Sequence, residues 1–140
     1  MVKLRLRRKG RMHHAVYDIV AVDGRARRDG AFLDKLGFYD PNTNPNTIRI
    51  DTNKALHWLS VGAQPTETVG LLFSYEGVLL RKHLKIKGKS QEEIEAEVEK
   101  HKNVVSARYE RRKKLRKERA IAKAKAEEAA KNKPAEEAAQ

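Results

Sequence analysis

The sequence predicts a small mixed fold in which a sheet packs with two short helices and is followed by a long charged helical extension. Three observations lead to this prediction: apolar residues alternate with cations near the start of the chain, turn-forming residues separate the short apolar runs that follow, and residues 91–140 contain no glycine. We therefore expect a folded domain over residues 1–88 and a charged extension over residues 89–140, mostly helical or partly disordered.

Four strands are expected in the first part of the chain. Residues 2–7 alternate three aliphatic side chains with three cations, which is the pattern of a strand with one packed face and one cationic face. A β-rich run follows at 15–22, and we expect a hairpin in which residues 7–14 form a long basic loop. Two further apolar runs, at 32–39 and 47–51, flank a turn rich in asparagine and proline that cannot continue a strand ladder.

Two short helices are expected next, and both should pack on the sheet. Thr52 or Asn53 can cap the first helix, whose apolar residues fall at helical spacing until Gly62 ends it. Thr66 can cap the second helix, which Gly77 ends.

The extension is expected to form a long exposed helix. Ser90 is followed three residues later by Glu93, which is the spacing of a capping box, and no glycine or proline then occurs before Pro134. The apolar residues of this stretch do not sustain a heptad, so a coiled coil is the less favoured alternative. A helix that lies along RNA or stays in solvent fits the pattern better.

Charge and composition limit the partners of the chain. Its 140 residues include 31 Lys and Arg against 19 Asp and Glu, a formal charge of +12 that favours a polyanionic partner. Nucleic acid is the leading candidate, and an anionic membrane surface is second. No apolar run approaches the ~18 residues of a membrane span, and the basic start lacks the apolar stretch of a secretory signal. The absence of cysteine excludes disulfides and thiolate metal sites.

The cations gather in the first strand with its loop, in a second loop and in the extension. Arginine suits bidentate phosphate contact better than lysine does, and backbone phosphates satisfy such clusters without base readout. The alternative interpretation is a solvated edge strand and a solvated helix, whose charges only discourage aggregation. The residues expected to bind RNA are Lys3, Arg5, Arg7, Arg8, Lys9, Arg11, His13, His14, Arg25, Arg27, Arg28, Tyr39, Arg111, Arg112, Lys113 and Lys114.

Aromatic side chains offer a second kind of RNA contact, because unpaired bases stack on them. Tyr17, Phe38, Tyr39 and Trp58 are the rings considered. Trp58 lies on the apolar stripe of its helix and is expected in the core. Tyr39 ends a strand beside the turn-rich segment and is the ring that we select.

An enzymatic alternative has little support. Asp23, Asp29 and Asp34 could form a carboxylate cluster for metal-assisted phosphodiester cleavage, but the first two are better explained as turn residues. The sequence offers no nucleophile with a base and no phosphate-binding glycine loop, and the spacing of the histidines does not suggest a metal site. We expect no catalytic residue, no metal and no cofactor. An architectural DNA-binding protein is a further alternative that shares the basic charge.

Several segments of the chain form a recognisable series in their order and spacing. They are Val2-Lys3-Leu4-Arg5-Leu6 with Arg8, Gly10 and Arg11, Tyr17-Asp18-Ile19-Val20, Asp23 with Arg25, Arg28-Asp29-Gly30, Gly37-Phe38-Tyr39-Asp40-Pro41, Ala55-Leu56-His57-Trp58-Leu59 and Gly62-Ala63-Gln64-Pro65-Thr66. This series resembles the family of bacterial ribosomal small-subunit protein sixteen over about residues 1–85. The family core does not extend to residues 91–140.

The resemblance implies a small α+β domain with a mainly antiparallel sheet of four to five strands and two short helices. It also implies a structural constituent of the small ribosomal subunit that binds small-subunit ribosomal RNA and supports its folding and assembly, and hence translation. Neighbouring small-subunit proteins are the other expected partners, and the expected location is the ribosome in the cytoplasm. Neither a membrane nor a second copy of the chain is expected as a partner.

Overall fold

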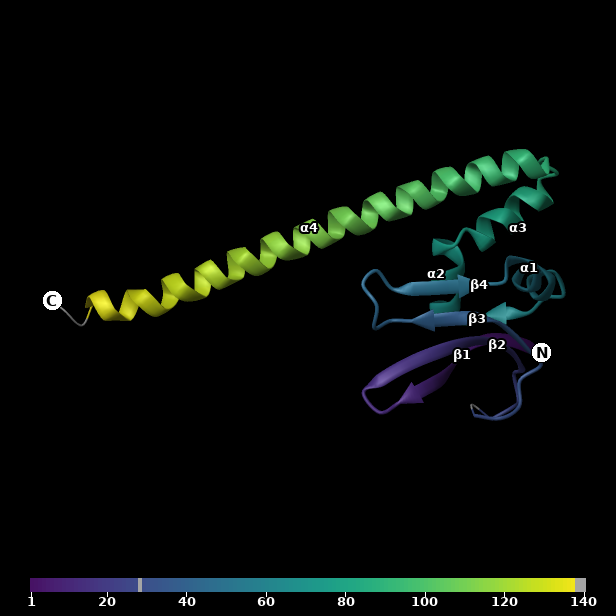
Figure 1. The fold of residues 1–140 in the computed structure, drawn as a ribbon, viewed down its shortest axis with the longest axis horizontal. Coiled ribbons are helices and arrows are strands. Elements are labelled where there is room, and N and C mark those ends of the chain that lie inside the picture. The colour runs from purple at the N-terminus through teal and green to yellow at the C-terminus, as the bar shows by residue number, and fades with distance from the viewer. Residues whose placement is uncertain (28, 138–140) are drawn as a thin grey trace. The chain divides into compact units, whose positions relative to one another are not determined.

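A computed structural model describes residues 1–27 and 29–137 of the chain. The chain divides into two units, Met1–Lys102 and Asn103–Gln140, which are treated separately below. The first unit contains a sheet and three short helices, together with the start of a long helix (Figure 1). The predicted α+β class is therefore confirmed. The domain boundary expected near residue 88 stays a prediction.

The sheet has five strands in the spatial order β4-β3-β2-β1-β5. β1 and β2 form a long antiparallel hairpin, and β3 pairs antiparallel with both β2 and β4. The two-residue β5 pairs parallel with β1. The sheet is mainly antiparallel, as predicted. The strands are β1 (Val2–Arg11), β2 (His14–Asp23), β3 (Asp34–Asp40), β4 (Thr47–Ile50) and β5 (Gln64–Pro65).

The hairpin of β1 and β2 is longer than predicted. The prediction of a long basic loop over residues 7–14 is wrong, because strand pairing continues to Arg11 and His14 and leaves a two-residue turn. His13 in this turn has φ 62°, and Gly10 has φ 88° with a Cβ position only 2.4 Å from the carbonyl oxygen of His14. Residues 8–14 are exposed, so this end of the hairpin extends past the core and can pair without an apolar face.

The helices follow the strands along the chain. They are α1 (Thr52–Ser60), α2 (Glu67–Tyr75), α3 (Val78–Ile86) and α4 (Gln91–Glu137). The first cap differs from prediction, because the carboxylate of Asp51 accepts from the backbone N of Asn53 at 3.1 Å and of Lys54 at 3.2 Å. Thr66 occupies the N-cap position of α2 as expected, but its side chain makes no capping hydrogen bond.

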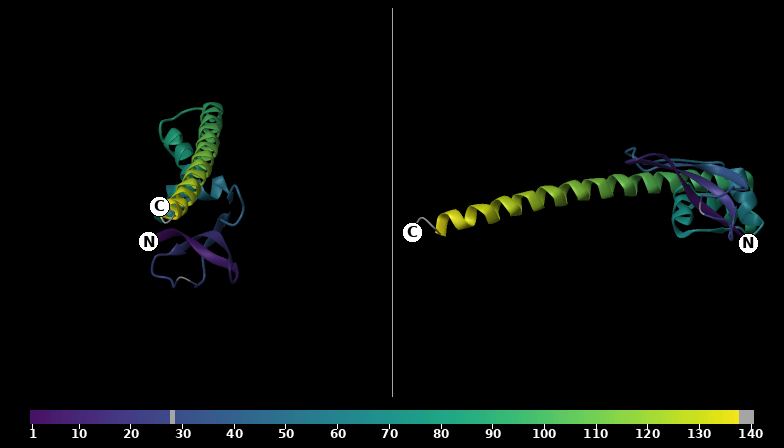
Figure 2. Two further views of the ribbon diagram at one scale, coloured as in Figure 1. Left: turned by 90° about the vertical axis from the view of Figure 1, so that its left-hand side faces the viewer. Right: turned by 90° about the horizontal axis from the view of Figure 1, so that it is seen from below.

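The main core lies on one face of the sheet, beneath the short helices (Figure 2). Leu4, Ile19 and Leu36 point into it from three neighbouring strands, and all are at most 1% exposed. Phe73 of α2 is fully buried among them. Half-buried Trp58 packs against this core, which confirms the interpretation of its apolar stripe.

The start of α4 belongs to a second core cluster that the sequence did not reveal. Ile94 and Val98 are each 2% exposed and pack with Leu84 of α3, a helix that was not predicted. The expectation of an exposed extension is therefore wrong for these turns. The sequence gives no clear signal for this cluster. Its apolar residues come from two separate helices, and each lies among charged residues. No helix among the described residues is long and apolar enough to cross a membrane.

Candidate nucleic-acid interface

The sheet face opposite the helices carries most of the cations of the strands. Leu4 and Leu6 of β1 face the core, so strand alternation places the intervening side chains on the opposite face. We call this surface the outer face. It contains Lys3, Arg5, Arg7 and Lys9 of β1, Asp18 of β2, Lys35 and Phe38 of β3, and Arg49 of β4.

A bulge in β3 places Lys35 on the outer face. The register between β2 and β3 shifts between Ile19 and Val20, and Leu36 is the extra residue of β3 at this point. Because Leu36 is 1% exposed in the core, Lys35 is left opposite Val20 on the other side. Simple alternation could not predict this placement, and Lys35 was not among the expected RNA-binding residues.

Asp18 lies among the outer-face cations. Its carboxylate is 2.8 Å from Nζ of Lys35 and 4.0 Å from Nζ of Lys9, and the residue is directly opposite Arg7 in the strand register. The side chain of Asp18 is only 14% exposed, whereas those of Lys9 and Lys35 are 68% and 46% exposed. One shielded carboxylate therefore reduces repulsion among cations whose charged ends still reach solvent.

Two arginines of the outer face organise the segment between β2 and β3. Arg5 Nη2 donates to the carbonyl oxygens of Arg27 at 2.6 Å and Ala26 at 3.4 Å. The guanidinium of Arg7 lies 5.1 Å from the ring centroid of Phe32, a cation–π contact. Arg5 and Arg7 thus hold the second basic loop against the hairpin, in addition to any contact with phosphate.

The other predicted cations of this unit occupy two places. The loop held by Arg5 presents Arg25 and Arg27, which are exposed. The far end of the hairpin presents Arg8, Arg11, His13 and His14, which are also exposed. Arg28 lies outside the described residues.

Tyr39, the aromatic residue selected from the sequence, lies on the core side of the sheet. Its ring stacks with that of Tyr17, with centroids 6.2 Å apart and planes at 27°, and its hydroxyl accepts from Asn46 Nδ2 at 3.2 Å. The ring also packs against the main core. Its predicted contact with RNA stays a prediction. Phe38, the preceding residue, is the aromatic side chain that β3 places on the outer face.

Asp34 joins β3 to α1. Its carboxylate accepts from Nζ of Lys54 at 2.8 Å and from Nε1 of Trp58 at 3.2 Å. The hydrogen bond from Lys54, followed by that from Trp58, holds the pKa of Asp34 below its ordinary value, and the same bond to Asp34 raises the pKa of Lys54. The contacts of Asp34 therefore give it a structural role.

The two other aspartates of the enzymatic alternative lie in the loop between β2 and β3. The carboxylate of Asp23 accepts from the backbone N of Arg25 at 3.0 Å, which confirms its interpretation as a turn residue. Asp29 also lies in this loop. In the described parts of the chain, no three or more histidines and carboxylates gather as a metal site would require.

The second unit presents its cations along α4. Arg111, Arg112, Lys113 and Lys114 are all exposed, and consecutive residues of an α-helix point about 100° apart. These four side chains therefore point in different directions around the helix, and their contact with RNA stays a prediction. Helical spacing also aligns Arg112 with three other exposed arginines of the same basic run, which were not among the expected RNA-binding residues: Arg108, Arg116 and Arg119.

Comparisons with known proteins identify relatives of this chain. Residues 8–66 match the family model described as Ribosomal protein S16. A relative from Prosthecochloris aestuarii, named small ribosomal subunit protein bS16, is 46% identical over 130 residues, which are 93% of this chain and 96% of the relative. The chain belongs to the ribosomal protein S16 family. A second relative of the same name, from Chloroherpeton thalassium, is 50% identical over 99 residues, covering 71% of this chain and 73% of its own.

The S16 family consists of structural ribosomal proteins and not of enzymes. Membership gives this chain a structural role in the small ribosomal subunit and in translation. The family model ends at residue 66, at the start of α2, whereas the alignment with the Prosthecochloris aestuarii protein spans most of this chain. The extended α4 therefore belongs to a part of the sequence that this S16 relative shares.

Proposed function

We propose that the protein binds small-subunit ribosomal RNA through phosphate contacts and thereby supports the folding and assembly of that RNA. The observation that carries the proposal is the outer face, where cations from three strands gather around the carboxylate of Asp18. The exposed cations of the hairpin end and of the loop after β2 extend this surface. Membership of the S16 family supports ribosomal RNA as the polyanion.

The proposed mechanism is electrostatic. RNA helices that approach one another closely repel through their phosphates, and cations on a rigid wedge between them lower that repulsion. Because the protein binds the packed arrangement more tightly than the open one, binding shifts the RNA toward the packed arrangement. A pre-formed sheet suits this task, since strand pairing fixes the spacing of its cations before RNA is bound.

The extension takes an accessory part in this proposal. The aligned arginines at positions 108, 112, 116 and 119 can follow one phosphate backbone, and neighbouring small-subunit proteins are the other partners that its charges can meet. We place the main RNA-binding surface within residues 1–88, in keeping with the expected domain organisation.

Salt dependence provides the test. The affinity of the full chain for a transcript of small-subunit ribosomal RNA should fall steeply as salt rises, with a log–log slope of about −0.7 to −0.9 per phosphate contact. A chain ending after Lys102 should keep most of this affinity. Ending there retains Ile94 and Val98, whose burial stabilises the first unit. An affinity that hardly changes with salt, or binding that requires residues 103–140, would contradict the proposal.

A further inference from the structure

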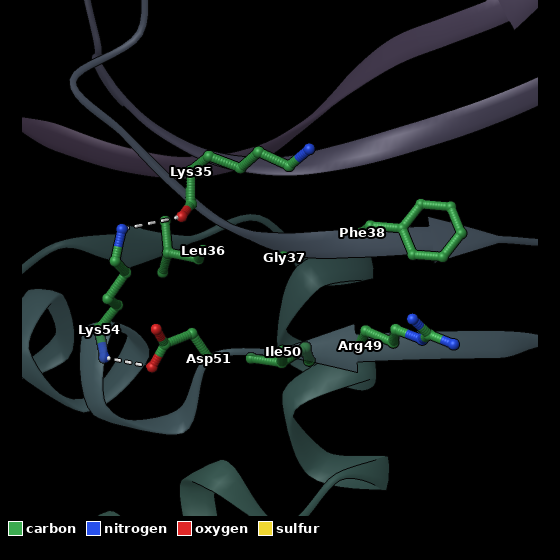
Figure 3. Close-up of a pocket in the computed structure, with 8 residues that line it drawn as sticks. All are labelled: Lys35, Leu36, Gly37, Phe38, Arg49, Ile50, Asp51 and Lys54. Carbon is green, nitrogen blue, oxygen red and sulfur yellow. Dashed lines mark hydrogen bonds between the residues drawn. The ribbon is translucent and has the colours of Figure 1, made fainter.

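A shallow hollow lies where β3 and β4 pair, and it combines an aromatic ring with cations (Figure 3). Phe38 and Lys35 line it from β3, and Arg49 lines it from β4. Lys54 of α1 borders its other end. β4 is the last strand in the sheet order, so the hollow lies at an edge that no further strand of this sheet covers.

Phe38 and Arg49 lie directly opposite each other in the strand register. Figure 3 shows both side chains extending from their strands toward the same end of the hollow. Phe38 is half-buried and belongs to neither core cluster, whereas the tyrosine rings of the sheet, Tyr17 and Tyr39, stack on each other. Arg49 is exposed, and its guanidinium makes no ion pair or hydrogen bond with a described residue.

The other charges around the hollow are already engaged. Lys35 pairs with Asp18 at 2.8 Å, and Lys54 pairs with Asp34 at the same distance. The carboxylate of Asp51 caps α1, as described above. Arg49 is therefore the cation beside Phe38 that pairs with no carboxylate of the described residues.

The two strands that line the hollow lie unusually close together. Gly37 separates Leu36 from Phe38, and a Cβ at this position would lie 2.2 Å from the carbonyl oxygen of Arg49. Only glycine lets β3 and β4 approach this closely. The side chain of Phe38 therefore stands beside a surface formed by backbone, with open space next to its ring.

We propose that Phe38 stacks on an unpaired base of ribosomal RNA and that Arg49 binds the adjoining phosphate. This inference rests on the proposed function and identifies a nucleotide-binding site within it. An aromatic side chain beside an exposed arginine is the combination with which proteins bind single-stranded nucleotides, since every base offers a face for stacking. A plain cross-strand pair would explain why Phe38 lies opposite Arg49 but not the open hollow beside them.

Substitutions that separate stacking from charge test the site. The full chain and its Phe38→Leu and Arg49→Gln variants are titrated with the small-subunit ribosomal RNA transcript at several salt concentrations. Phe38→Leu should weaken binding about 5- to 150-fold, the range expected for loss of one stacked base, and leave the salt slope unchanged. Arg49→Gln should reduce the slope by about 0.7–0.9, which corresponds to one phosphate contact.

A matched control and a direct probe complete the experiment. Tyr75→Leu changes an aromatic residue at the end of α2 that is 44% exposed and does not belong to the outer face, so it should leave the affinity within about twofold. In a Phe38→Trp variant, the added tryptophan fluorescence should be quenched by an eight-nucleotide oligoadenylate, beyond any change that Trp58 gives in the unsubstituted chain. This readout also decides the matter if Phe38→Leu fails to fold.

The outcomes separate this inference from the proposed function. If the full chain binds the transcript with a steep salt slope but Phe38→Leu binds equally well, or the added tryptophan is not quenched, the nucleotide site is refuted and phosphate binding stands. If the full chain does not bind the transcript, both proposals are wrong. Loss of affinity in Phe38→Leu with quenching in Phe38→Trp would support the site.

Discussion

Arg5 provides a sharp test of how the outer face is organised. Its guanidinium donates to the carbonyl oxygens of Ala26 and Arg27, so it ties the basic loop after β2 to the hairpin. Replacing Arg5 with glutamine removes both hydrogen bonds and the charge. The prediction is that Arg5→Gln weakens the fold and the RNA contact together, because the loop that presents Arg25 and Arg27 is no longer held.

The size of the effect follows from the two hydrogen bonds. A bond from a charged donor contributes about 1.5–3 kcal/mol when it is well shielded, and one of these two bonds is exposed while the other is long. We therefore expect a loss of about 1–2 kcal/mol in the free energy of unfolding. For a folded unit of about 100 residues, this corresponds to a fall in Tm of about 4–16 °C.

Thermal unfolding followed by circular dichroism measures this effect, and Lys9→Gln is the matched control. Lys9 is on the same face of the same strand, but its side chain is 68% exposed and only 4.0 Å from Asp18. Its substitution should change the unfolding free energy by less than about 0.5 kcal/mol. It should still reduce the salt slope of RNA binding by about 0.7–0.9 if Lys9 contacts one phosphate.

Equal Tm values for Arg5→Gln and the unsubstituted chain would refute the organising role of Arg5. Hydrogen exchange of the amides at 24–27 and 29–33 adds a local readout, since release of this loop should speed their exchange in Arg5→Gln alone. Unchanged exchange rates with a lowered Tm would place the effect elsewhere in the unit.

Three further predictions concern stability. Gly37→Ala should lower Tm, because the added Cβ would lie 2.2 Å from a carbonyl oxygen of β4. Gly70→Ala, inside α2 with nothing within 4 Å of its Cβ, should instead raise the free energy of unfolding by about 0.5–1 kcal/mol. Equal Tm values for the two variants would refute this. The pKa of Asp34 is lowered by hydrogen bonds from a lysine and a tryptophan, so the ionised carboxylate stabilises the folded state. This contribution to the free energy of unfolding is present above about pH 4 and is lost as the pH falls through the pKa of Asp34 in the folded state. Acid titration of Asp34→Asn should therefore show a flatter loss of stability, and an unchanged acid limb would contradict this. Val98→Ala should cost about 1–3 kcal/mol in urea unfolding, and Val104→Ala, at a position 48% exposed, should cost less than about 0.5 kcal/mol; similar losses would argue against the second core cluster.

Local patterns made most of the fold predictable. The alternation in residues 2–7 identified β1 and its packed face, and the apolar spacing before Gly62 and Gly77 identified α1 and α2. Both glycines have positive φ, 91° and 76°, which is why they end these helices. The hairpin turn was mistaken for a loop because strand pairing beyond the core leaves no apolar alternation to detect.

The candidate site was predictable in its charge but not in its arrangement. Runs of Arg and Lys identify a basic strand and a basic helix, since the residue types alone fix the charge. Which of these cations also hold the protein together depends on contacts far along the chain. Arg5, for example, bonds to carbonyls 21 and 22 residues away, and no spacing within the sequence indicates this.

The sequence by itself determined the α+β class, the cationic strand and the long helix, because each follows from a periodicity that a residue shares with its near neighbours. Only the tertiary structure decided that Phe38, and not Tyr39, lies on the outer face, and that Lys35 joins it there. One extra residue in β3 decides where this strand changes face, and the bulge exists only because β2 pairs with it. The burial of Ile94 and Val98 has the same origin, since a partner helix must pack against them before their apolar side chains become a core.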